Sequence, residues 1–174
     1  MTTKRDDSLD SLYRIHRDYI QHEDTLVNQR TTWLITIQAF LIATFGFSYQ
    51  KLFEVAEKMN GRDTPVAVDQ LGPIASEYKT FLAALAIVGV VTSFAAFFSI
   101  IAARRAVGAI AKNWETVPRR GGSDYLPGIT GGGAGWNVFL GSVIAIGTPL
   151  FFASMWLYAI KSVVFEFEVN GFLR

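Results

Sequence analysis

Cysteine is absent from the 174 residues, which excludes disulfide bonds and thiolate metal sites. The two histidines, His16 and His22, have no matching third ligand, so we expect no bound metal. The glycine run at 131–135 lacks the Gly-Lys-Ser/Thr ending of a phosphate-binding loop, and no strand precedes it. We interpret this run as a hinge or spacer and expect no cofactor. No nucleophile–base arrangement is recognisable, which indicates that the protein is not an enzyme.

Charge is also absent from long stretches of the chain. All 31 Lys, Arg, Asp and Glu residues lie outside three apolar blocks, and two of these blocks, 81–103 and 138–160, have 23 residues each. A helix of that length spans about 34 Å, enough for a hydrocarbon core of about 30 Å. The block at 33–49 has 17 residues and reaches Phe53 if Lys51 extends to the headgroups. We interpret it as a first span; a buried or interfacial helix is the alternative.

The sequence therefore predicts an all-α membrane protein with three transmembrane helices, the first of which continues from a long cytoplasmic helix. The predicted segments are a cytoplasmic amphipathic helix with Ser8 as its cap (1–32), spans at 33–53, 81–103 and 136–160, an outer loop (54–80), a cytoplasmic helix extension with a glycine-rich loop (104–135), and an outer tail (161–174). Gly72-Pro73 predicts a turn in the outer loop, and Pro149 predicts a kink in the third span.

The distribution of positive charge predicts the orientation. Ten Lys and Arg residues lie in segments 1–32 and 104–135. The segments on the opposite side have six, together with seven Asp and Glu residues. This bias favours a cytoplasmic N-terminus in a bacterial inner membrane. Aromatic residues are expected at both boundaries, where they would form interfacial belts: Trp33 and Trp136 inside, and Tyr49, Tyr78, Trp156 and Tyr158 outside.

Large apolar residues recur every seven positions through the first helix: Leu12, Tyr19, Leu26, Trp33, Phe40 and Phe47. A stripe of this period is typical of a helix that packs against another helix along its length. With few other helices in the chain to cover it, we favour a homo-oligomeric bundle over packing on the protein's own helices. Leu26, Trp33, Phe40 and Phe47 are then candidates for a constriction.

Apart from Lys51 at the end of the first, no Lys, Arg, Asp, Glu or His residue lies within any predicted span, which argues against a coupled transporter but not against a passive pore. Gln38, together with Thr36 and Thr44, is a candidate for the polar lining of such a pore. Hydrogen bonding between helices is an equally open interpretation of these residues. Gly89 with Ser93, and Gly141 with Ala145, are small residues four apart, a spacing that lets helices approach closely.

The Arg17–His22 pair matches the Arg-x4-His signature of the HEPN ribonuclease superfamily, which would make the chain a nuclease. A five-residue offset, however, separates the two side chains by about 140° around a helix. We favour a polar cytoplasmic seam that pairs helices, with these members: Arg17, His22, Glu23, Asn28 and Arg30.

The residues from His22 to Leu34, followed by Gln38-Ala39-Phe40-Leu41, carry the pattern Glu-x-x-Leu-x-Asn-x-Arg-x-x-Trp-Leu and then Gln-x-Phe-Leu. This pattern resembles small bacterial multi-pass membrane effectors and accessory proteins of antiphage defence systems. The resemblance implies an oligomeric pore or membrane-disrupting effector that depolarises the infected cell. It also implies a cytoplasmic protein or a nucleotide or oligonucleotide signal as activating partner, received by the N-terminal helix or the glycine-rich loop.

Our leading hypothesis is thus a homo-oligomeric membrane channel or membrane-disrupting effector. A non-conducting anchor or assembly subunit that binds a cytoplasmic partner is the alternative, and a HEPN-like ribonuclease is a remote one. The expected partners are membrane lipid and further copies of the chain. A net charge of +1 gives no reason to expect direct nucleic-acid binding.

Overall fold

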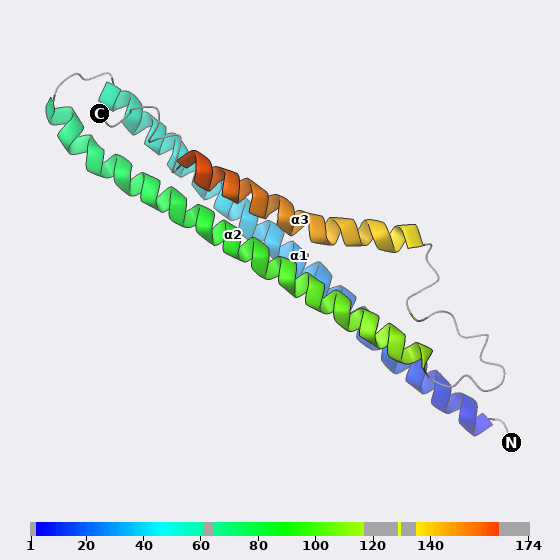
Figure 1. Ribbon diagram of the computed structural model, residues 1–174. Coiled ribbons are helices and arrows are strands. Elements are labelled where there is room, and N and C mark those ends of the chain that lie inside the picture. Colours follow the sequence, from blue (N-terminus) through cyan, green and yellow to red (C-terminus); the bar gives the residue numbers. More distant parts are fainter. Residues whose placement is uncertain (1–2, 61–64, 117–128, 130–134, 164–174) are drawn as a thin grey trace. The chain divides into compact units, whose positions relative to one another are not determined.

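Three α-helices contain nearly all of the residues that the computed structural model describes, which are 3–60, 65–116, 129 and 135–163 (Figure 1). Helix α1 (Thr3–Asn60) has 58 residues, α2 (Pro65–Glu115) has 51 and α3 (Gly135–Lys161) has 27. Each contains a segment long and apolar enough to cross a membrane. The prediction of an all-helical chain with three candidate spans is therefore confirmed.

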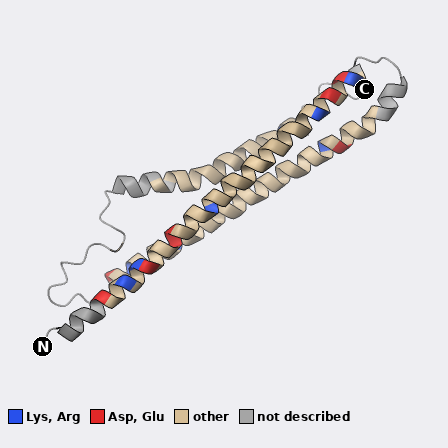
Figure 2. Cartoon of the chain, turned by 180° about the vertical axis from the view of Figure 1, so that it is seen from behind, with Lys and Arg blue, Asp and Glu red and all other residues tan. Residues whose placement is uncertain are grey.

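Helix α1 is continuous from its charged N-terminal half into its apolar second half. It contains no proline and a single glycine, Gly46, so nothing in the sequence interrupts the backbone hydrogen bonds. Its charged residues lie toward the N-terminal part and in the last turns, with an uncharged stretch between them (Figure 2). The predicted continuity through Trp33 is confirmed. The prediction of Ser8 as the cap is wrong, because the helix begins at Thr3.

Helix α2 begins well before the predicted second span. The sequence allowed one or two further helical turns up to Met59 at the start of the predicted outer loop (54–80), and α1 does continue to Asn60. The prediction of a loop from there to residue 80, with a turn at Gly72-Pro73, is wrong, because α2 begins at Pro65 and runs through Pro73. Proline removes one backbone donor, yet the helix is continuous through Pro73, and Ala75 is buried just beyond it. At the other end, the predicted extension past residue 103 is confirmed. The helix ends at Glu115, and the Thr116 amide then donates to the Asn113 carbonyl at 3.2 Å.

The chain divides into two compact units. Unit 1 comprises Met1–Thr32 with Ala96–Gly147, and unit 2 comprises Trp33–Ala95 with Thr148–Arg174. In unit 1, Tyr13 and Ile20 of α1 pack with Trp114 of α2 and with Ile129. The Tyr13 and Trp114 rings meet edge to face with centroids 5.5 Å apart, an arrangement favoured by the charge distribution of aromatic rings.

In unit 2, parts of all three helices share a core. One cluster of buried residues joins Leu52 of α1 with Ala75 and Leu82 of α2 and Val163. A second joins Leu41 of α1, Ala86 of α2 and Trp156 of α3. In each cluster a buried alanine of α2 lies among larger side chains of the other segments, and its small size lets them come close to the α2 backbone.

Helix α3 covers the predicted third span, and Pro149 lies inside it in a buried position. This proline leaves the Ala145 carbonyl without its usual helical donor; the predicted kink stays a prediction. The predicted stop at Pro118 and most of the glycine-rich loop lie outside the described residues, as does the tail beyond residue 163.

Candidate functional site

The side chain of Gln38 is completely buried in the apolar part of unit 2. It lies on the same face of α1 as Leu34 and Leu41, which are buried as well, as expected for positions spaced by three and four residues. This face packs against the other helices of the unit. A buried amide in such surroundings requires hydrogen-bond partners, because an unsatisfied polar group costs about 1–3 kcal/mol.

Gln38 finds those partners on both other helices. Its Nε2 donates toward three oxygens of α2: Ser93 Oγ at 3.0 Å, Thr92 Oγ1 at 3.1 Å and the Gly89 carbonyl at 3.3 Å. Its Oε1 accepts from Trp156 Nε1 of α3 at 2.5 Å. One amide therefore links α1 to α2 through its donor end and to α3 through its acceptor end. We refer to Gln38, Gly89, Ser93 and Trp156 as the three-helix contact.

Gly89 contributes to the three-helix contact in two ways. Its carbonyl also accepts from Ser93 Oγ at 2.7 Å and from Thr92 Oγ1 at 3.1 Å, so it concentrates the polar interactions of α2 at one point. In addition, a Cβ atom at this position would overlap the central ring atoms of the Trp156 indole. Only glycine allows the indole to lie this close to the α2 backbone.

Of the two pairs of small residues that predicted a close approach between helices, only one is matched by such an approach in the described structure. At Gly89 and Ser93, α3 does approach the α2 backbone closely, and Trp156 fills the space. At Gly141, a Cβ would meet no atom within 4 Å, so no close approach requires glycine there, although Ala145 is buried.

Trp156 is the member of the three-helix contact whose role the sequence did not indicate. The prediction that it belongs to an interfacial aromatic belt is wrong, because its side chain is only 1% exposed. Its ring packs edge to face with Phe45, and its N–H is directed at Gln38. Trp33, by contrast, is 68% exposed, as a residue facing lipid or a partner would be.

The remaining constriction candidates lie on a different face of α1 from Gln38. Within unit 2, Trp33, Phe40 and Phe47 are 68%, 74% and 73% exposed, whereas Leu34, Gln38 and Leu41 are buried. Leu26, in unit 1, is half-buried. Of the two interpretations of Gln38, its contacts are those of interhelical hydrogen bonding. Thr44 donates to the Phe40 carbonyl of its own helix at 2.9 Å.

The predicted polar seam lies in unit 1, where two of its arginines are engaged within the protein. Arg17 Nη1 donates to the Tyr13 hydroxyl at 3.0 Å, and Arg30 Nη1 donates to the Ser99 carbonyl of α2 at 3.2 Å. His22 and Asn28 are exposed and Glu23 is half-buried. The contacts of Arg30 thus join α1 to α2, while pairing of the seam with another chain stays a prediction.

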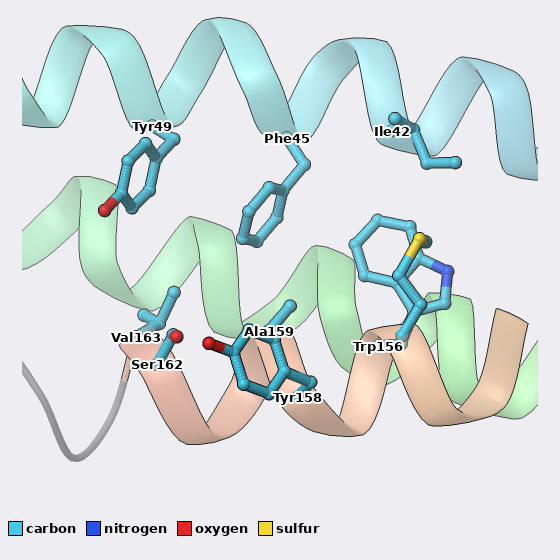
Figure 3. Close-up of a pocket in the computed structure, with 9 residues that line it drawn as sticks. Ile42, Phe45, Tyr49, Trp156, Tyr158, Ala159, Ser162 and Val163 are labelled. Carbon is cyan, nitrogen blue, oxygen red and sulfur yellow. The ribbon is translucent and has the colours of Figure 1, made fainter.

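A groove of about 290 Å³ lies beside the three-helix contact, between α1 and α3 (Figure 3). Its walls carry mostly apolar side chains: Ile42, Phe45, Tyr49, Met155, Trp156, Tyr158, Ala159, Ser162 and Val163. Phe45 and Tyr49 stack with ring centroids 6.2 Å apart and extend from α1 toward α3. Nothing in the sequence pattern predicted this groove, because it depends on how Phe45 and Trp156 meet.

The three-helix contact is suited to holding the helices together, and the groove is suited to binding apolar groups. Across the described part of the chain, His, Asp and Glu residues nowhere gather in a group of three that could hold a metal ion. The absence of a cofactor or of catalytic activity stays an expectation from the sequence. No protein-family model, curated protein or solved structure matches this chain.

Proposed function

We propose that the protein is a homo-oligomeric channel or membrane-disrupting effector of the bacterial inner membrane, of the antiphage class that the pattern from His22 to Leu41 resembles. The observation that carries the proposal is the outward aromatic stripe of α1 in unit 2. Trp33, Phe40 and Phe47 stand seven residues apart and are each about 70% exposed. The opposite face of the helix is already occupied by the chain's own helices.

A seven-residue period is a feature of packing between helices and is not required for contact with lipid. Residues that face only lipid need to be apolar but have no need of a 3.5-residue repeat. Identical stripes from several copies would bring Trp33, Phe40 and Phe47 together around an axis. Bulky apolar rings in such a position form a constriction that conducts only when it becomes wetted. Gln38 is not part of this lining, since it is buried within the protomer.

Expression of the protein in bacteria should depolarise the inner membrane, and Phe40→Ala or Trp33→Ala should change the rate of depolarisation several-fold. Both side chains are exposed in the single chain, so their truncation should leave the stability of the protomer within about 0.5 kcal/mol. The measurement is uptake of a potential-sensitive dye after induction. Phe151→Ala on α3 is the matched control, because Phe151 is 66% exposed but lies outside the stripe.

An unchanged membrane potential in cells that express the wild type and both variants would reject the channel. The number of copies in the purified particle supplies an independent check. A protein that is monomeric both in detergent and in vesicles would contradict the proposed homo-oligomer. A phenotype equally altered by Phe151→Ala would show that the stripe has no special role.

A second function, an anchor that binds a cytoplasmic partner, is supported by exposed apolar residues in unit 1. Leu12, Ile15 and Tyr19 are 40%, 53% and 61% exposed on the charged part of α1. Large apolar groups on an otherwise hydrophilic surface are typical of protein interfaces. Under this function, a defined partner should co-purify with the full chain, and no conductance should appear in planar bilayers.

For the anchor, Ile15→Ser combined with Tyr19→Ser should reduce recovery of the partner at least tenfold, because the pair supplies the exposed apolar surface. Quantitative mass spectrometry of the purified complex measures the recovery. Thr25→Ala, an exposed change on the same helix, is the control and should leave it intact. Full recovery of the partner with the double variant would place the interface elsewhere.

A further inference from the structure

Helix α3 differs from the other two helices at the point where it passes from unit 1 to unit 2. The passage falls between Thr32 and Trp33 in α1, between Ala95 and Ala96 in α2, and between Gly147 and Thr148 in α3. Helix α1 contains no proline, and the proline inside α2, Pro73, lies far from the passage. In α3, Pro149 follows the passage directly. Only α3 therefore combines the passage with a residue that breaks helical hydrogen bonding.

Two residues weaken the backbone of α3 at this point. Pro149 has no N–H, so the Ala145 carbonyl lacks its usual helical donor. Gly147, two positions earlier, has more backbone freedom than any other residue type. A Cβ atom on Gly147 would meet no atom within 4 Å, so packing does not require glycine there. Sharp bends in helices concentrate at positions of this kind.

The part of α3 that follows the passage is firmly held in unit 2. Pro149, Ala153 and Trp156 are buried, and the Trp156 ring packs with Leu41 and Ala86. The Trp156 N–H also donates to the buried amide of Gln38. Moving this part of the helix would break the three-helix contact.

The part of α3 that precedes the passage has few buried side chains. Of residues 141 and 143–147, for which the structure describes exposure, only Ala145 is buried. Val143 and Ile144 are 49% and 66% exposed, and a Cβ atom on Gly141 would meet no atom within 4 Å. A segment with few buried contacts can move at a low cost in free energy.

We propose that residues 147–149 form a hinge within α3. Residues 135–146 swing about this hinge as one helical segment, while residues 150–161 stay packed in unit 2. Trp156 lies on the packed side, so the three-helix contact persists in every position of the swinging segment. The hinge goes beyond the channel or anchor function and does not depend on either.

Pulsed electron paramagnetic resonance tests the hinge in the full-length protein, because the chain has no cysteine and introduced cysteines can be spin-labelled selectively. Val143→Cys with Leu157→Cys places labels on both sides of the hinge at positions that are 49% and 52% exposed. The two positions would be about 21 Å apart along a straight helix. In vesicles, the distribution of label distances should be about twofold wider than for a pair of equal sequence separation on a regular helix.

Val88→Cys with Ala102→Cys on α2 is that matched control pair. Both positions are exposed, they have the same separation in sequence, and they lie on either side of the passage of α2 with no proline between them. A distribution for the α3 pair that is as narrow as the one for the α2 pair would overturn the proposal.

Pro149→Ala and Gly147→Ala, each added to the α3 pair, should narrow its distribution toward that of the α2 pair. Pro149 is buried, so its substitution also changes the packing in unit 2, whereas Gly147→Ala adds a methyl group where there is space for it. Alanine is the more favourable residue in a helix in both cases. An unchanged width in both variants would overturn the proposal.

Discussion

Replacing Gly89 with alanine should destabilise the protein by about 1–3 kcal/mol, the usual effect of inserting a methyl group into a filled core. The added Cβ would overlap the central atoms of the Trp156 indole, which is 1% exposed and cannot swing away as a flexible side chain could. Moving the indole would also lengthen its hydrogen bond to Gln38. The free energy of unfolding in a mild detergent, titrated with dodecyl sulfate and followed by circular dichroism, measures the change.

Gly46→Ala is the matched control for Gly89→Ala. Gly46 lies in the middle of α1 in the same unit, and a Cβ there would meet no atom within 4 Å. Alanine is favoured over glycine in a helix by up to about 1 kcal/mol, so this variant should be as stable as the wild type or more so. The two substitutions are chemically identical and should have effects of opposite sign. Equal stability of the two variants would show that α3 does not approach α2 at Gly89.

The three helices that are apolar enough to span a membrane could be predicted from the sequence because they depend on local composition. Uncharged stretches of 23 residues have few alternatives to a membrane helix, and α2 and α3 contain them. The absence of proline from α1 likewise made its continuity predictable. The loop at 54–80 was predicted wrongly because Gly72-Pro73 is a strong local turn signal. Helical residues on both sides and the buried contact at Ala75 outweigh it in the folded protein.

The three-helix contact was only partly predictable, because it depends on distances between residues far apart in the chain. Gln38 is conspicuous as a polar residue in an apolar helix, but the periodicity of the sequence does not identify the residues that contact it. Pore lining and interhelical hydrogen bonding were therefore equally open interpretations. Gly89 and Ser93 indicated a close approach without identifying the helix that makes it. Trp156, separated from Gln38 by 118 positions, carried only the general expectation for a tryptophan near a membrane boundary.

The two faces of α1 in unit 2 suggest separate roles for stability and function. The inner face, with Gln38, holds the protomer together through polar contacts with specific geometry. The outer face, with Trp33, Phe40 and Phe47, leaves large rings exposed and contributes little to the folding of a single chain. Variants on the outer face should therefore change the proposed membrane activity without changing the stability of the protomer. Variants on the inner face should change that stability, and they should change activity only where assembly requires a folded protomer.

Replacing Gln38 with leucine should lower the free energy of unfolding by about 1–3 kcal/mol, because it leaves the Trp156 N–H buried without its acceptor. Ser93 remains bonded to the Gly89 carbonyl at 2.7 Å, so the loss falls mainly on the link to α3. Trp156→Phe removes the same hydrogen bond from the other side and also leaves a small cavity. Both single variants should be less stable than the wild type in the same detergent titration.

The double variant Gln38→Leu with Trp156→Phe separates the hydrogen bond from these side effects. Once either partner is gone, removing the other no longer breaks the bond, so the double variant should be about 1–2 kcal/mol more stable than the sum of the single effects. Thr44→Val is the control, because the Thr44 hydroxyl donates to the Phe40 carbonyl of its own helix, and this variant should couple to Trp156→Phe by less than about 0.5 kcal/mol. Additive effects of Gln38→Leu and Trp156→Phe would mean that the bond between α1 and α3 contributes nothing to the fold. In that case close packing, at Gly89 and around Leu41, Phe45 and Ala86, would hold α3 in place.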